Sequence, residues 1–279
     1  MIRLENVSLS YPLLDIGSHS LQVTLREKMH EKISGLVGGN IGTSRSTPYV
    51  GALNKISLAI QDGQRVALIG HNGAGKTTLL RLISGIYTPT QGKITVQGKI
   101  NALIDITLGM DPDVSGIKNI IFRLVFMGLT LAEAKKAIDE IVDFSGLAEF
   151  IHLPVRTYST GMFLRLAFAI STHIPPDILI LDEIIGAGDE AFKEKVLRRI
   201  DYLFTQSRIV VLSSHDMGLV KKYCDSAIWL NKGNIVANGR ADEVVSLYLA
   251  NDNCSPLSKS IKNPPAAQTT RGDPLFQRG

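Results

Sequence analysis

The residues best suited to chemistry form a stretch that matches the spacing G-x-x-x-x-G-K-[ST]: Gly70, His71, Asn72, Gly73, Ala74, Gly75, Lys76 and Thr77, followed by Thr78. The apolar run RVALIG precedes this stretch, and a helical pattern from Lys76 to about Ser84 follows it. Glycines let such a loop fold tightly, so that backbone N–H groups and the positive end of the helix face a phosphate. Lys76 would neutralise phosphate charge, and the Thr77 hydroxyl would ligate Mg²⁺. The stretch therefore predicts a nucleotide phosphate site.

Two acids and a histidine follow apolar strands further along the chain. Asp182 and Glu183 come directly after ILIL, and His215 comes after VLSS. Ligands bind at the carboxyl ends of strands in doubly wound sheets. We therefore expect Asp182 to hold Mg²⁺ through its water shell, Glu183 to polarise the attacking water, and His215 to lie near the terminal phosphate. The alternative is that these are solvated polar residues at strand ends.

A further motif, Tyr158-Ser159-Thr160-Gly161-Met162, opens the helical segment FLRLAFAI. A Ser cap followed by Gly presents a hydroxyl, backbone N–H groups and a helix dipole to a phosphate. The motif resembles the signature of ABC ATPases, usually L-S-G-G-Q; Ser159 and Gly161 match, whereas Thr160 and Met162 depart. The order of phosphate loop, signature, acid pair and histidine is also that of the ABC family, over roughly residues 1–250.

This resemblance implies a P-loop NTPase of ABC ATPase type that uses ATP and Mg²⁺ and works as a homodimer. Each ATP would lie between the phosphate loop of one copy and the Ser159–Gly161 helix of the other. Asp189 falls at the family's D-loop aspartate. Tyr11 is a candidate to stack on adenine, although an aromatic at a strand end is also typical of packing. One departure concerns coupling, because the family's Gln is absent from NALIDITLGMDPDVSGIKN after the strand near 99–104.

Several variants resemble a subfamily that exports lipid-linked polysaccharides such as O-antigen, capsule or wall teichoic acid. They are YSTGM, DEIIGAGD, the LGMDPDVSG stretch and the long insertion after Tyr11. The resemblance implies an ATP-hydrolysing subunit on the cytoplasmic face of the inner membrane, bound to an integral membrane permease with a lipid-linked glycan as cargo. The open alternatives are a drug or lipid as cargo, or a non-transport ABC ATPase. The latter usually carries two cassettes or a coiled-coil insert.

The composition agrees with a soluble globular class. The 279 residues are 44% hydrophobic and 20% charged, and the net charge of +4 is too small to argue for a nucleic-acid partner. No signal peptide and no run of the ~20 apolar residues that a membrane helix needs is evident. We therefore expect another chain to form any path across a membrane. Cys224 and Cys254 lie far apart and predict free thiols.

The alternation of strand and helix patterns predicts an α/β domain over 1–250 with a small antiparallel β subdomain, a helical subdomain near 115–175 and a flexible tail at 251–279. An insertion at 12–50 carries Leu21, Leu25, Met29 and Ile33 at helical spacing. They would cover their own domain or contact the membrane subunit or glycan lipid. Further helices are expected at 116–128, 130–144, 161–173, 190–205 and 241–250, and strands at 2–11, 56–60, 65–70, 93–97, 99–104, 178–182, 208–214, 226–230 and 234–239.

Overall fold

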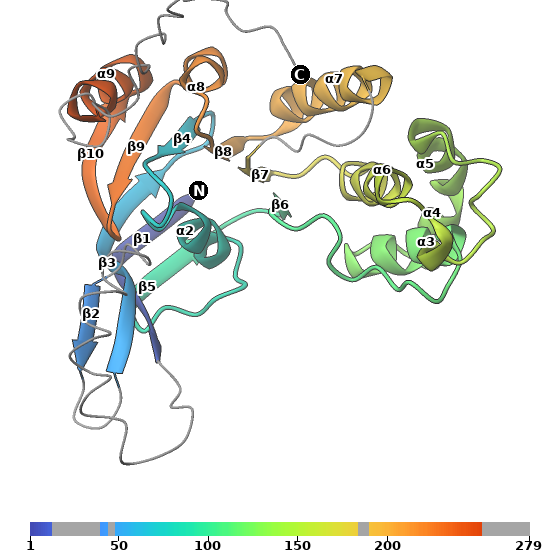
Figure 1. The fold of residues 1–279 in the computed structure, drawn as a ribbon, viewed down its shortest axis with the longest axis horizontal. Helices are drawn as coiled ribbons and strands as arrows, with labels where there is room; N and C mark the ends of the chain where they lie inside the picture. The colour runs from blue at the N-terminus through green and yellow to red at the C-terminus, as the bar shows by residue number, and fades with distance from the viewer. Residues whose placement is uncertain (13–39, 44–47, 184–189, 253–279) are drawn as a thin grey trace, which may run out of the picture.

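A six-stranded sheet forms the centre of the molecule, as seen in the computed structural model, which describes residues 1–12, 40–43, 48–183 and 190–252 (Figure 1). Its order is β10-β9-β4-β8-β7-β6. The strands from β9 to β6 pair in parallel, and β10 pairs antiparallel with β9. The strands are β4 (Arg65–Ile69), β6 (Ile100–Leu103), β7 (Ile178–Asp182), β8 (Ile209–Ser213), β9 (Ser226–Asn231) and β10 (Asn234–Arg240).

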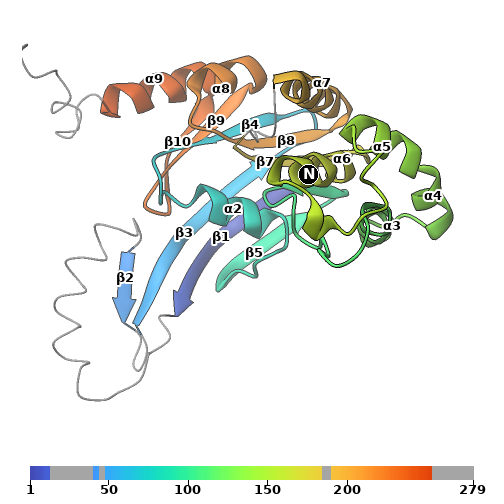
Figure 2. The same cartoon turned by 45° about the vertical axis from the view of Figure 1, so that its right-hand side comes forward.

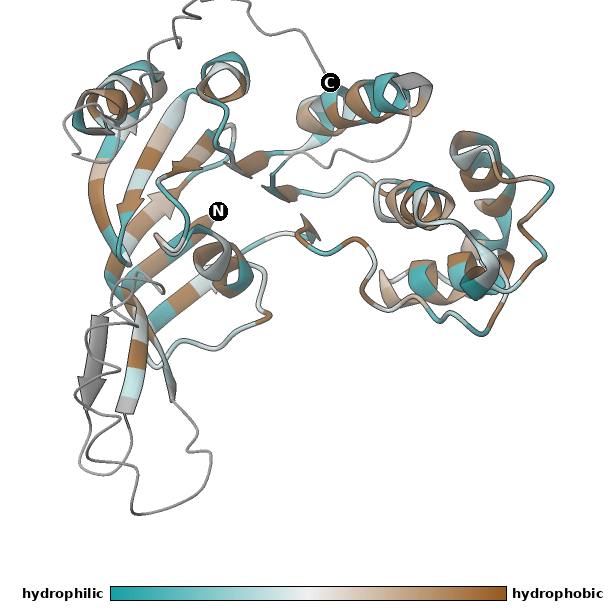
Figure 3. Cartoon of the chain, viewed as in Figure 1, coloured by the Kyte–Doolittle hydropathy of each residue, from teal (hydrophilic) through white to brown (hydrophobic). Residues whose placement is uncertain are grey.

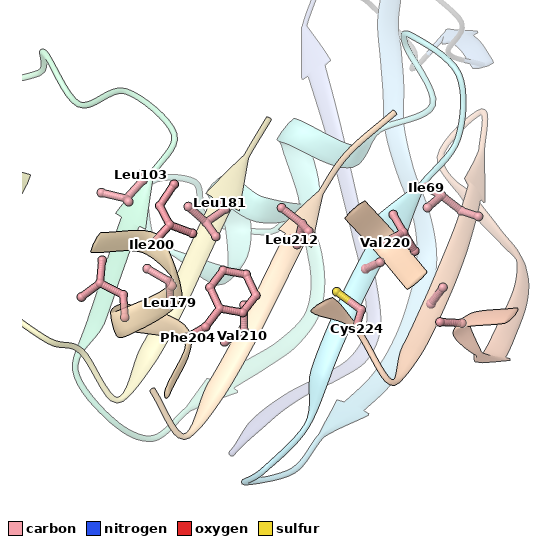
Figure 4. Close-up of a cluster of buried hydrophobic side chains, with 14 of the residues drawn as sticks. Ile69, Leu103, Leu179, Leu181, Ile200, Phe204, Val210, Leu212, Val220 and Cys224 are labelled. Atoms are coloured by element: carbon pink, nitrogen blue, oxygen red, sulfur yellow. The ribbon is translucent and has the colours of Figure 1, made fainter. Parts of the chain in front are cut away.

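Both faces of this sheet are buried, which explains the continuous apolar runs of its strands. Leu179, Leu181 and their neighbours on one face pack against helices, and Ile178 and Ile180 pack on the other face. Figure 4 shows the first of these clusters, in which Cys224 also lies, and burial raises the pKa of its thiol to about 12. The helices of this layer are α7 (Glu190–Gln206), α8 (Met217–Tyr223) and α9 (Ala241–Asp252).

A four-stranded antiparallel sheet and helix α2 (Lys76–Ile83) cover the opposite face. The sheet has the order β2-β3-β1-β5, and its long strands β1 and β3 extend away from the body in Figure 2. Tyr11 pairs with Val50 in the register of β1 and β3. The strands are β1 (Ile2–Pro12), β2 (Asn40–Thr43), β3 (Pro48–Ile60) and β5 (Gln91–Val96).

A helical subdomain forms a separate lobe with its own apolar core (Figure 1). Its helices in Figure 3 carry both hydrophobic and hydrophilic residues, as expected for elements with one buried side. Arg123 ties the lobe together, since its guanidinium donates to the Ile106 carbonyl at 2.5 Å and the Ser171 hydroxyl at 3.0 Å. The helices are α3 (Gly116–Phe126), α4 (Leu131–Lys136), α5 (Ile138–Ser145), the short 3-10 helix η1 (Val155–Thr157) and α6 (Thr160–Ser171).

The expected elements are present, with three differences. After β1, regular structure resumes earlier than predicted, because β2 and the start of β3 lie inside the predicted insertion 12–50. The helix expected at 130–144 is divided at Ala137 into α4 and α5. Helix α8 and the short helix η1 were not predicted. Within the described ranges, no helix is long and apolar enough to span a membrane. The following lie outside those ranges: Leu21, Leu25, Met29, Ile33, Asp189, Cys254 and the tail from 253.

Candidate functional site

The phosphate loop joins β4 to α2 and borders a cavity of about 440 Å³. Its glycines are needed for shape: Gly70, Gly73 and Gly75 all have positive φ angles. A Cβ atom on Gly70 would lie 2.3 Å from the Leu230 carbonyl oxygen, which excludes a side chain there. Among the described residues, no side chain caps the start of α2. Because the first N–H groups of a helix have no partner within it, this helix end offers donors to an anion.

Lys76 is buried, with 7% of its surface exposed, and its amine is bound by the backbone of the loop. Its Nζ donates to the carbonyl oxygens of Gly70 at 2.6 Å and His71 at 3.2 Å. Burial lowers the pKa of Lys76, while the charges of Asp182 and Glu183 act in the opposite direction. A partly desolvated cation near two carboxylates is suited to binding the negative charge of a phosphate.

Thr77 and Asp182 meet although they are 105 residues apart, because α2 packs beside the end of β7. The Thr77 hydroxyl donates to Asp182 Oδ2 at 2.6 Å. A hydroxyl and a carboxylate are oxygen ligands of the type that Mg²⁺ prefers. In the described part of the chain, no three His, Cys, Asp or Glu side chains gather as a metal site. A metal at Thr77 and Asp182 would therefore take its other ligands from water and phosphate.

Glu183 and His215 face each other across the ends of β7 and β8. The distance between Glu183 Oε1 and His215 Nε2 is 3.4 Å, and the same Nε2 lies 3.2 Å from Lys76 Nζ. A ring nitrogen accepts when it is deprotonated and donates when it is protonated, so Nε2 can serve only one of these partners at a time. Glu183 has a φ angle of 53°, and its backbone N–H donates to the Ser213 carbonyl at 3.0 Å. Such strained backbone is typical of functional sites.

Tyr11 lines the same cavity and also packs against another aromatic side chain. Its ring contacts that of Tyr87 edge-on, with centroids 5.8 Å apart. Burial raises the pKa of the Tyr11 hydroxyl, and a hydrogen bond with Thr78 opposes this. Tyr11 therefore packs against Tyr87 and also borders the cavity, and its contact with adenine stays a prediction.

The predicted site residues divide into four groups. Those that line the cavity are Tyr11, Asn72, Gly73, Ala74, Gly75, Lys76, Thr77, Thr78, Asp182, Glu183 and His215. Gly70 and His71 are not in its lining but hold Lys76 through their carbonyl groups. Ser159 and Gly161 do not line it either, and Asp189 lies outside the described residues.

Ser159 caps α6 at an exposed corner of the helical subdomain. Its Oγ accepts the Met162 N–H at 3.2 Å, and among the described residues a Cβ on Gly161 would meet only that Oγ, at 3.9 Å. The predicted cap is therefore present, and no described residue crowds Gly161. In the described part of the chain, this helix end does not line the cavity that the phosphate loop borders.

Three cavity residues were missed: Val50, Ala52 and Ser213. Val50 and Ala52 reach the cavity because β3 pairs with β1, which the sequence does not reveal. Ser213 is fully buried at the end of β8, and its hydroxyl has no partner among the described residues. Its position two residues before His215 was the available signal.

Known proteins are similar to this chain over most of its described length. A family model described as ABC transporter matches residues 53–186. The O-antigen export system ATP-binding protein RfbE of Yersinia enterocolitica is 43% identical over 83% of this chain and 94% of its own length. The corresponding RfbB of Myxococcus xanthus is 44% identical over 80% of this chain, which spans only 51% of that relative. The teichoic acids export ATP-binding protein TagH of Bacillus anthracis is 38% identical over 81% of this chain and 41% of its own length.

The fold is likewise that of solved ATP-binding cassettes. A structure of the ATP-binding subunit of an ABC transporter matches with a TM-score of 0.64 and 19% identity, over 89% of this chain and 93% of the other. A dimeric cassette in a post-hydrolysis state with ADP and Pi matches with a TM-score of 0.62 and 20% identity, over 86% and 99%. The expected fold class is therefore confirmed.

Proposed function

The chain belongs to the family of ABC transporter ATP-binding proteins, and from this premise we propose that it is the ATP-hydrolysing subunit of a polysaccharide exporter. The cargo would be a lipid-linked glycan of the O-antigen, capsule or teichoic acid type. The cavity that unites Lys76, the Thr77–Asp182 pair and Glu183 carries the enzymatic part of the proposal. Relatives named for the export of O-antigen and teichoic acids support the cargo.

The residues have distinct roles in this proposal. Lys76 and the backbone of the phosphate loop bind the phosphates, and Tyr11 contacts the adenine. Thr77 and Asp182 would hold Mg²⁺, which would supply neutralisation of phosphate charge. Glu183 orients water and takes up its proton, and His215, whose Nε2 lies 3.4 Å from Glu183 Oε1, contacts the terminal phosphate.

The protein would act as a homodimer. Ser159 caps the helix that carries Gly161, and among the described residues neither of the two lines the chain's own cavity. The helix end would therefore serve the ATP held by the other copy, and Asp189 would lie at the same interface. ATP binding would close the dimer, and hydrolysis would reopen it.

The membrane step requires an integral membrane permease. No described helix can span a membrane. The chain would sit on the cytoplasmic face of the inner membrane, which the relatives named for export support, and would pass its motion to the permease. The segment after β6 is where the family has Gln. Here the Asn119 side chain stabilises it, because Nδ2 donates to the Asp111 carbonyl and Oδ1 accepts the Asp111 N–H.

Two measurements test the proposal. The purified chain should release phosphate from ATP in a Mg²⁺-dependent manner, and Lys76→Ala should abolish this. In cells that carry the chain and its permease, Glu183→Gln should leave the completed glycan on its lipid carrier inside the cell. Absence of hydrolysis would contradict the enzymatic part, and normal glycan at the cell surface would contradict the cargo.

A further inference from the structure

A turn late in the chain lies directly beside the phosphate loop. It joins β9 to β10 through Lys232 and Gly233, which both have positive φ angles, 46° and 76°. Asn231 pairs with Asn234 across it, so the hairpin has a two-residue turn of the type I′ class. In such a turn the N–H and C=O of the second central residue are not used by the hairpin itself. These groups are therefore available for tertiary contacts.

Gly233 uses both groups to join the two walls of the nucleotide cavity. Its N–H donates to the Ala74 carbonyl of the phosphate loop at 2.9 Å, and its carbonyl accepts the Asn54 N–H of β3 at 2.9 Å. The contact is close, because a Cβ on Gly233 would lie 2.5 Å from the Ala52 carbonyl oxygen. Ala52 and Ala74 both line the cavity, so the turn fixes their separation.

Asn231 makes a second link, through a side chain. Its Oδ1 lies 2.9 Å from Nε2 of His71, whose Nδ1 lies 3.0 Å from the Asn72 carbonyl oxygen. The ring does not line the cavity, but the His71 carbonyl accepts from Lys76 Nζ at 3.2 Å. Asn231 thus holds the ring of His71, and the carbonyl group of His71 in turn positions the amine of Lys76.

We propose that the β9–β10 turn is a positioning element for nucleotide binding. Asn231, acting through His71, and Gly233, acting through Ala74, hold the phosphate loop in the shape that receives the phosphates. Neither residue reaches the reacting atoms, so the turn sets the affinity for ATP and leaves the hydrolytic step to Glu183. The inference rests on the proposed function, because it concerns the same ATP site.

The first test replaces the side-chain link. Asn231→Ala should raise the KM for ATP about three- to tenfold, the size expected for one lost hydrogen bond, with kcat within about twofold of wild type. Asn238→Ala is the matched control, because Asn238 is exposed on the same hairpin. If Asn231 acts through His71, Asn231→Ala should have no further effect on KM in a His71→Ala background.

The second test uses the backbone link. Gly233→Ala places a methyl group against Ala52 at a positive φ angle and should raise KM by about tenfold. Gly63→Ala imposes similar strain, since Gly63 has a φ of 85° with nothing within 4 Å of an added Cβ, and it should leave KM unchanged. Melting curves verify that each variant is folded.

The outcomes separate this inference from the function on which it rests. A wild-type chain that neither binds nor hydrolyses ATP would overturn both. An active wild type whose KM is unchanged by Asn231→Ala and Gly233→Ala would overturn only the role of the turn. So would a fall in kcat at constant KM, or additive effects of Asn231→Ala and His71→Ala.

Discussion

The two ends of the central parallel sheet both gather charged side chains, but they use them differently. At the carboxyl ends of the strands, Lys76, Asp182, Glu183 and His215 surround a cavity. At the amino ends, Asp177 precedes β7 and Arg208 precedes β8, and Arg208 pairs with Asp62 and lies 3.8 Å from Asp177. Asp62, Asp177 and Arg208 are partly or largely exposed and pair with one another, and none of the three lines the nucleotide cavity.

The difference lies in burial and backbone geometry rather than in the number of charges. Lys76 is buried against two carbonyl groups, whereas the side chain of Arg208 is 55% exposed. Glu183 has a left-handed backbone, and α2 directs its N-terminus at the same space. A cluster of charges therefore indicates a site only where a cavity, a desolvated cation and free helix donors coincide.

The largest expected effect is on turnover, at the acid that follows β7. Glu183→Gln should lower kcat at least ~100-fold, as expected for the loss of a general base, while ATP binding stays near normal. Phosphate release and the Kd for ATP measure the two separately. Asp177→Asn, at the other end of the same strand, is the control and should leave kcat unchanged. Near-normal turnover in Glu183→Gln would remove the distinction between the two ends.

The next effect is on affinity. Lys76→Ala should weaken ATP binding by about tenfold or more, because a charge-assisted contact to phosphate is lost. The carbonyl groups of Gly70 and His71 also lose their donor. Equilibrium titration with ATP measures this, and unchanged affinity would show that the buried amine has another task.

The third prediction is that a second copy of the chain completes the nucleotide site, and its measured effect is the partial recovery of hydrolysis in mixed dimers. Lys76→Ala and Ser159→Arg should each be inactive, but a mixed dimer should have one site with both changes and one site with neither. Mixing the two chains should therefore restore hydrolysis well above either parent. Mixed dimers that form but remain inactive would contradict the shared site.

Much of this site was predictable because its chemistry follows from local patterns. The phosphate loop is contiguous, and Asp182 and His215 follow apolar strands, so the rule for strand ends placed them together. Helix α8 was missed because its seven residues hold too few turns for a periodic pattern, although Asp216 caps it by accepting the N–H groups of Gly218 and Leu219.

The parts that could not be predicted depend on long-range pairing. Val50 reaches the cavity only because β1 and β3 pair with several register shifts, so that Val50 lies opposite Tyr11. Asn231 meets His71 across 160 residues because β9 pairs with β4. No local pattern sets either register, which follows from how the whole sheet is assembled.

The smallest effect is expected at the amino ends of the strands. Arg208→Ala should leave KM and kcat unchanged and lower the melting temperature only slightly, because exposed ion pairs contribute little. The hydrogen bond from Arg208 lowers the pKa of Asp62, so the folded-state pKa lies below the unfolded one. The pair therefore stabilises the fold above the unfolded pKa, and this contribution is lost as the pH falls through the folded pKa. Melting curves of both proteins should differ at pH 7 and converge as the pH falls below about 4. A difference that persists in acid would mean that Arg208 acts through packing instead, and a change in KM would connect the two ends of the sheet.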